Sequence, residues 1–182
     1  MNTTDLYRNA LYFACKAHNE QKMPASELPY FLHITEVMTE TLLAFQEKET
    51  NDKNLNQQLG VLVAILHDTV EDTLVTLEEI ESQFGEEVKN GVWAMTKDEK
   101  LPKEEQMNDS LEKLLKQPIE VQFVKLADRI VNLKEPPHYW NIEKRIKYQE
   151  EAKLILEKLG DASLYLAKRL QEKIENYEQY FV

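Results

Sequence analysis

The chain contains the run Ile65-Leu66-His67-Asp68-Thr69-Val70-Glu71-Asp72-Thr73. It places four groups that can bind a metal ion, or work beside one, directly after the apolar stretch 61–66. An apolar stretch of this kind is typical of the buried end of a helix. A buried helix end that changes at once to His-Asp and Glu-Asp is costly unless a cation compensates the charge. The run therefore indicates a metal site at the end of a buried helix.

The composition around this run favours helices. The chain has 182 residues but only 4 glycines and 6 prolines, and its long stretches are rich in Leu, Glu, Lys and Gln. No stretch alternates cleanly enough between apolar and polar residues to demand a sheet. The sequence predicts an all-α fold, a single domain over residues 1–182 built as a bundle of about eight to ten helices.

The net charge of −11 narrows the class of partner. A protein that binds the nucleic-acid backbone is usually basic, so we expect no nucleic-acid partner. A small polyphosphate substrate remains compatible, because a bound divalent ion can reverse the sign of the local field.

The single cysteine, Cys15, excludes an intrachain disulfide and suits a reducing cytosol. Its neighbours predict that it packs in an apolar helix face. No segment reaches the ~20 apolar residues of a membrane span, and the N-terminus has no signal-peptide core. We expect a cytoplasmic protein without a membrane partner.

Periodicity and breakers divide the chain into helices. After a segment that ends in His67-Asp68, we expect Thr76 and Glu79 to form a capping box for a helix that stops near Phe84. Gly85 can then take the left-handed conformation. The other expected helices cover residues 4–19, 30–46, 86–95, 103–116, 141–159 and 162–180. One more helix has Pro118 in its first turn and is ended by Pro136-Pro137.

Three polar or proline-containing stretches are expected to connect these helices. Residues 20–29 form a loop punctuated by Pro24 and Pro29, and the polar stretch 47–54 follows the second helix. The charged stretch 97–100 is expected to be a solvated loop. Whether the region 96–117 orders only with ligand stays open.

Two further residues extend the central run into a metal site. His33 stands at the start of a helix, and Asp128 interrupts an otherwise apolar helical pattern. Together with His67 and Asp68 they would give a nitrogen and oxygen site without thiolate, which suits manganese, iron or magnesium better than structural zinc. The alternatives are a capping or packing role for His33 and an ion pair of Asp128 with a neighbouring Lys125 or Arg129.

Glu71 and Asp72 follow the His-Asp pair by four positions each, about one helical turn. A carboxylate beside a metal can accept a proton from water, and the metal makes that water acidic enough to lose it. We therefore assign Glu71 the main catalytic role and Asp72 a supporting one. A solvated helix end is the alternative for both.

Motifs spread over most of the chain match one family. They are Ala17-His18 with Gln21, Pro29-Tyr30 with His33, the run from Leu66 to Thr73, Phe84-Gly85, Lys125-Leu126-Ala127-Asp128-Arg129 with Asn132-Leu133, and Trp140 with Tyr148. With these motifs the chain resembles the HD-domain phosphohydrolases, and among them the RelA/SpoT-type hydrolase domains and the stand-alone small alarmone hydrolases. The similarity runs from about residue 8 to about residue 170.

The resemblance implies specific roles and a substrate. It implies manganese held by four ligands, a water oriented and activated by Glu71 and Asp72, and a contact of Asn132 with the ribose or phosphate side of a nucleotide. Family members remove the 3′-diphosphate of guanosine 3′,5′-bis(diphosphate) as pyrophosphate. The implied metal ligands are His33, His67, Asp68 and Asp128.

Basic residues are the candidates for phosphate contact, and salt bridges are their alternative role in so acidic a chain. The substrate-binding candidates are Lys22, Arg129, Lys144 and Arg145.

One position departs from the family. Met23 stands where the family often has an Arg that packs against the guanine base, and a thioether cannot supply that cation. Three functions therefore stay open: hydrolysis of the guanosine alarmone, hydrolysis of another 2′- or 3′-phosphorylated nucleotide such as a phosphorylated dinucleotide, and a non-catalytic nucleotide-binding regulatory module. The oligomeric state is also open.

Overall fold

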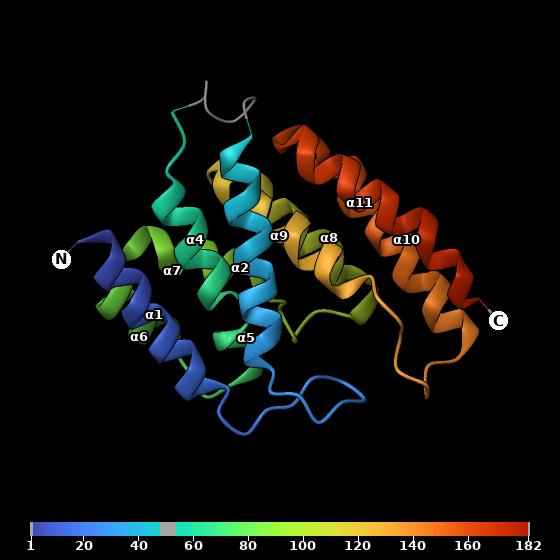
Figure 1. The fold of residues 1–182 in the computed structure, drawn as a ribbon, viewed down its shortest axis with the longest axis horizontal. Helices are drawn as coiled ribbons and strands as arrows, with labels where there is room; N and C mark the ends of the chain where they lie inside the picture. Colours follow the sequence, from blue (N-terminus) through green and yellow to red (C-terminus); the bar gives the residue numbers. More distant parts are fainter. Residues whose placement is uncertain (1, 48–53, 182) are drawn as a thin grey trace.

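The computed structural model describes residues 2–47 and 54–181, so most of the predicted polar stretch 47–54 lies outside the described residues. Within these two ranges the chain is helical, and its only β feature is an isolated antiparallel bridge between Lys22 and Pro29. The all-α prediction is confirmed (Figure 1). The helices are α1 (Thr3–Ala17), α2 (Phe31–Gln46), α4 (Gln57–Leu66), α5 (Thr69–Asp72), α6 (Leu77–Phe84), α7 (Glu86–Met95), α8 (Lys103–Leu115), α9 (Ile119–Asn132), α10 (Ile142–Leu159) and α11 (Leu164–Tyr177), with 3-10 turns at Gly160–Ala162 and Glu178–Tyr180.

Short polar side chains begin several of these helices. The side chains of Asn2, Asn56, Asn141 and Ser163 each accept a hydrogen bond from a backbone amide in the first turn of α1, α4, α10 and α11. Such a bond satisfies one of the amides that has no partner inside the helix. The predicted capping box of α6 is present and formed by Thr76 and Glu79.

Three predicted helix ends are wrong by a few residues. α1 stops at Ala17 rather than at residue 19, because His18 leaves the helix and turns its side chain toward Gln21. α9 stops at Asn132, short of residue 136, because Pro136 has no amide to bond the carbonyl of Asn132 and its ring would clash there. Residues 162–163 are a 3-10 turn and a cap ahead of α11.

Two local predictions also need correction. Gly85 has a positive φ of 91° as expected, but its ψ of 168° is extended and not left-handed helical. This conformation lets one residue end α6 and begin α7, since its amide bonds Glu81 and its carbonyl accepts from Lys89. Cys15 is exposed, so its predicted packing is wrong.

The centre of the molecule is α4, which is buried along residues 59–66. It packs against α1, α2, α7 and α9, and Figure 1 shows α2 beside it, with α10 and α11 at the far side of α9. The close approach of α7 depends on Gly91, where an added Cβ would lie 2.6 Å from a methyl carbon of Val63. This packing brings the C-terminal end of α4 against the first turn of α2 and the last turns of α9.

No helix in the described ranges has the length and apolarity needed to cross a membrane. The region 96–117 is described without a ligand, and α8 forms most of it.

Candidate metal centre

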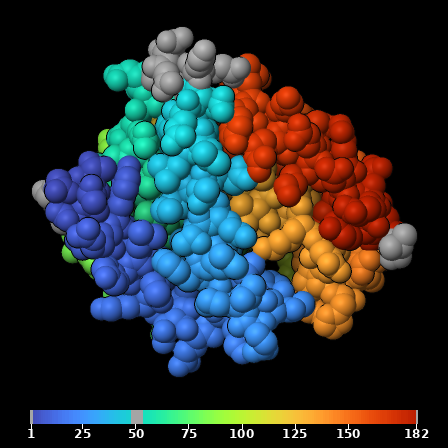
Figure 2. Space-filling model, in the orientation of Figure 1, coloured from blue at the N-terminus to red at the C-terminus, as the bar shows by residue number. Residues whose placement is uncertain are grey.

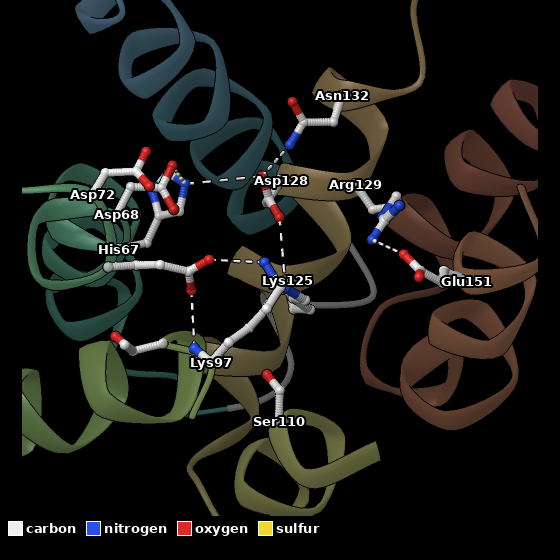
Figure 3. Close-up of polar contacts among 12 residues, drawn as sticks. His67, Asp68, Asp72, Lys97, Ser110, Lys125, Asp128, Arg129, Asn132 and Glu151 are labelled. Atoms are coloured by element: carbon white, nitrogen blue, oxygen red, sulfur yellow. Dashed lines mark hydrogen bonds and ion pairs between the residues drawn. The ribbon is translucent and has the colours of Figure 1, made fainter. Parts of the chain in front are cut away.

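The four predicted metal ligands lie together where α2, α4 and α9 meet. His33 is in the first turn of α2, His67 caps the end of α4, Asp68 precedes α5, and Asp128 is in α9. One atom each of His33, His67 and Asp68 lie within 4.8 Å of one another. An Oδ1 of Asp128 lies 3.5 Å from the Nε2 of His33 and 3.9 Å from that of His67. Figure 3 shows Asp68 and Asp128 approaching each other from opposite sides of this cluster.

The two imidazole rings present the same nitrogen to the cluster. The Nδ1 of His67 lies 2.9 Å from the carbonyl oxygen of Ala64, so this nitrogen is a donor and Nε2 is the ring nitrogen that faces the cluster. The Nε2 atoms of His67 and His33 lie 3.3 Å apart, and both rings are buried. A hydrogen bond from the outer ring nitrogen to a carbonyl is the usual way in which a metal-binding histidine is oriented.

Charges within the cluster are strongly coupled. Burial lowers the pKa of His33, but hydrogen bonds with Asp128 and Asp68 outweigh it and raise the pKa to about 9. Burial raises the pKa of Asp68 and of Asp128, but other groups outweigh this effect and hold both values well below the usual range. For Asp68 these groups are His67 and His33, and for Asp128 they are His33, Lys125 and His67. Two ionised carboxylates and two imidazole nitrogens that converge in this way suit a divalent cation with nitrogen and oxygen ligands.

Lys97 contacts Glu71, and the sequence did not predict this contact. Both carboxylate oxygens of Glu71 accept hydrogen bonds from it, one from the backbone amide at 2.9 Å and one from Nζ at 2.7 Å. The prediction of a solvated loop is therefore wrong at this residue. The spacing of the charged stretch 97–100 carries no signal of this contact, which only the tertiary fold creates.

Asp72 lies on the other side of α5 and is held by a second contact. Its Oδ2 accepts a hydrogen bond of 2.9 Å from the side-chain amide of Gln21. Burial of part of the carboxyl raises the pKa of Asp72, and the hydrogen bond from Gln21 works in the opposite direction.

Tyr30 also contacts the cluster, and the sequence predicted no individual role for it. Its hydroxyl donates a hydrogen bond of 2.6 Å to Oδ2 of Asp68, and its ring packs against those of His18 and His33. The signal was present, because Tyr30 precedes His33 by three positions and so shares its face of the chain as α2 begins.

A cavity of about 400 Å³ opens beside the cluster. It lies between the loop around Met23 and the segment that joins α9 to α10, and the surface in Figure 2 is recessed where these blue and orange parts face each other. Its walls are mainly apolar and aromatic, with Met23, Tyr30, Trp140 and Tyr148 among them. His33 and Asn132 also line it, so the cavity adjoins the four predicted ligands.

Asn132 is the predicted nucleotide contact that lies at the cluster, where its side-chain amide donates to Oδ1 of Asp128 at 2.6 Å. Lys144 is exposed, and its Nζ lies 4.1 Å from the ring centre of Trp140, which lines the cavity.

The three other predicted phosphate contacts have protein partners. Lys22 is ion-paired with Glu27 in the loop 20–29. Arg129 is buried and points away from the cluster toward Glu151, at 3.6 Å (Figure 3). Arg145 donates hydrogen bonds to the carbonyl oxygens of residues 140 and 180.

Comparison with known proteins gives consistent relatives. The family described as HD domain matches residues 10–163. The chain is 31% identical over 166 residues to guanosine-3′,5′-bis(diphosphate) 3′-pyrophosphohydrolase MESH1 of Drosophila melanogaster, covering 88% of each chain. It is 30% identical to the protein of the same name from Homo sapiens, covering 87% of each.

A solved structure agrees with these relatives. The protein, described as a metazoan orthologue of SpoT that hydrolyses ppGpp and plays a role in starvation responses, superposes with a TM-score of 0.80. It shares 28% sequence identity with this chain, and the match covers 94% of each.

Proposed function

Because this chain belongs to the HD domain family, we propose that it is a metal-dependent phosphohydrolase acting on guanosine 3′,5′-bis(diphosphate). Water would cleave the 3′-diphosphate from the ribose and release pyrophosphate and GDP. The observation that carries this proposal is the convergence of His33, His67, Asp68 and Asp128 beside a cavity with aromatic walls. Relatives named as hydrolases of this alarmone, matched over most of their length, support the choice of substrate.

The four ligands would hold a divalent ion, and we propose manganese. Bound there, such an ion supplies acidification of water and neutralisation of phosphate charge. Tyr30 orients Asp68, and the carbonyl of Ala64 orients His67, so the ligand set is prepared before an ion binds.

Glu71 is our proposal for the residue that accepts the proton of the attacking water, with Asp72 in support. The two hydrogen bonds from Lys97 fix the direction of the Glu71 carboxylate. Lys97 and the neighbouring Lys125 also place positive charge near the reacting phosphate.

In this proposal Asn132 and Lys144 contact the nucleotide. Asn132 lies at the cluster, and Lys144 packs over Trp140 of the cavity wall, which supports these roles. The other three basic candidates now contact protein groups. To bind the substrate they would have to leave these groups and contact phosphate instead; they are Lys22, Arg129 and Arg145. The ion pair of Lys22 with Glu27 is exposed and would cost little to exchange.

A second substrate class is favoured by one observation. Met23 is 8% exposed and lines the cavity where the family often has a cation for guanine. An apolar wall accepts other bases, so the alternative substrate is another 2′- or 3′-phosphorylated nucleotide, for example a phosphorylated dinucleotide. A non-catalytic regulatory module is the weaker alternative, because all four ligands and both carboxylates are in place.

The experiment is a panel of nucleotides offered to purified, manganese-loaded protein, with metal analysis on the same sample and Asp128→Asn as the inactive control. Pyrophosphate released from the guanosine alarmone alone supports the first proposal. Phosphate released from another nucleotide instead supports the second. Metal bound at equal stoichiometry with no turnover of any substrate supports the regulatory module.

We further propose that one HD domain covers residues 1–182, that the protein is cytoplasmic, and that its partner is a small nucleotide rather than nucleic acid or a membrane. The charge of −11 supports the exclusion of nucleic acid.

A further inference from the structure

A chain of two hydrogen bonds links a buried histidine to a proposed catalytic carboxylate. The Nδ1 of His18 lies 2.6 Å from Oε1 of Gln21, and Nε2 of Gln21 lies 2.9 Å from Oδ2 of Asp72. We propose that Gln21 is a positioning residue that fixes the carboxylate of Asp72, and that His18 in turn fixes Gln21. The catalytic consequence rests on the proposed function, whereas the structural claim does not.

The direction of both bonds follows from the acceptor at the end of the chain. An ionised carboxylate only accepts, so the NH₂ group of Gln21 must face Asp72 and its carbonyl oxygen must face His18. That oxygen also only accepts, so Nδ1 of His18 carries the proton and donates it. A Gln21 turned the other way would set two acceptors against each other at Asp72.

His18 is placed for this role at a cost. It is 2% exposed, and its Nε2 is buried without a hydrogen-bond partner among the described residues. A buried polar group without a partner is unfavourable, and an apolar residue would fill the same space without that penalty. The bond to Gln21 is the interaction that the histidine gains in return.

The backbone of Gln21 is clamped from both sides. Its amide donates to the carbonyl of His18 at 3.0 Å, and its carbonyl accepts from the amide of Tyr30 at 2.8 Å. The same Tyr30 donates its hydroxyl to the metal-ligand candidate Asp68. The loop 18–30 therefore contacts both carboxylates at the ends of α5, Asp72 through Gln21 and Asp68 through Tyr30.

Asp72 needs such a support. It is exposed, and it ends a helix of a single turn, α5, which cannot hold a side chain rigidly. Asp68 and Glu71 repel its charge, and the hollow on its open side is lined by two more carboxylates, Glu20 and Glu79. The hydrogen bond from Gln21 favours the charged form of Asp72, and His18 adds a smaller effect in the same direction.

The direct test measures Asp72 itself and needs no turnover. The side-chain carboxyl is titrated by ¹³C NMR in protein loaded with Mg²⁺, which is diamagnetic, and Asp72→Asn assigns the signal. Gln21→Met keeps the size of the side chain and removes the donor, so the pKa of Asp72 should rise by about one pH unit. The control Gln83→Met, at an exposed glutamine of α6, should leave it unchanged. An unchanged pKa in Gln21→Met would overturn the proposal.

Kinetics then test the consequence. Gln21→Met should lower kcat about tenfold with an unchanged KM and metal content, because Asp72 would act on water and not on substrate binding. His18→Asn keeps a donor near the position of Nδ1 and should retain activity, while His18→Leu should behave like Gln21→Met. Equal losses in both His18 variants, with equal falls in thermal stability, would show a packing role and contradict the proposal for His18.

The proposed function and the proposed role of Gln21 can be refuted independently of each other. A wild-type protein that releases no pyrophosphate refutes the proposed function, and the NMR titration still decides whether Gln21 holds Asp72.

Discussion

Replacing Asp128 by asparagine removes one charge from the cluster and almost no volume. The carboxylate lies 3.5 Å from Nε2 of His33 and 3.9 Å from that of His67, and its other oxygen lies 3.7 Å from Nζ of Lys125. If these groups form a metal site, Asp128→Asn deletes one of two anionic ligands. Loss of an outer hydrogen-bond partner alone weakens metal binding ~10- to 100-fold, so loss of a ligand should weaken it by at least about 100-fold.

The same substitution changes the stability of the metal-free protein. An attraction over 3.7 Å amounts to about 4 kcal/mol at an effective dielectric constant of about 20. Burial lowers the pKa of Lys125, and loss of Asp128 also removes its repulsion of Asp68, so this value is an upper bound. We expect the free energy of unfolding to fall by about 2–3 kcal/mol, at or below the low end of the ~3–5 kcal/mol for breaking a buried ion pair, because the lost repulsion of Asp68 offsets part of the loss.

Two assays separate these effects. Calorimetric titration with Mn²⁺ measures the affinity, and urea unfolding in excess chelator measures the stability. Asp161→Asn, at an exposed aspartate after α10, is the control and should change neither. Manganese affinity in Asp128→Asn within threefold of wild type would refute the assignment of Asp128 as a ligand.

Three further substitutions test separate parts of the account. Glu71→Ala should keep the metal stoichiometry and lose turnover by ~100-fold or more, as for a lost acid–base group; loss of metal would identify Glu71 as a ligand instead. Gly91→Ala places a Cβ 2.6 Å from a methyl carbon of Val63, so urea unfolding should show a loss of about 1–3 kcal/mol, and an unchanged midpoint would contradict the packing of α7 on α4. Met23→Arg adds a cation to the cavity wall and should lower KM for the guanosine alarmone about 3- to 30-fold, from a cation–π energy of ~0.5–2 kcal/mol. An equal change for the adenosine analogue would show that this position does not select the base.

Most helices could be predicted from the sequence because the residues that start and stop a helix lie within a few positions of its ends. Thr76 and Glu79 meet as predicted since a capping box needs only residues three positions apart. The end of α9 was placed too late because Pro136 acts on a residue four positions before it, so the helix must stop well ahead of the proline. Cys15 has apolar neighbours in the chain, yet its side chain is exposed, because tertiary packing and not the local sequence decides which side of α1 is covered.

Some residues of the candidate site could likewise be predicted from the sequence, and others could not. His33, His67 and Asp128 stand out because polar residues interrupt apolar helical patterns, and the fold brings them together. Lys97 does not stand out, because it follows α7 as one charge among several and reaches Glu71 only through the packing of α7 against α4. The partners of Arg129 lie on α10, about twenty positions away, so the sequence could not show that its guanidinium is directed away from the cluster.

We propose that His33, His67, Asp68 and Asp128 bind a divalent ion and that this ion is needed for hydrolysis of a nucleotide 3′-diphosphate. The most direct measurement is pyrophosphate release from guanosine 3′,5′-bis(diphosphate) as Mn²⁺ is titrated into chelator-treated protein. The account predicts that activity rises from the background level with bound metal and that GDP and pyrophosphate form in equal amounts. Protein that is fully loaded with manganese and releases no pyrophosphate, or that releases it equally well after chelation, would contradict the account.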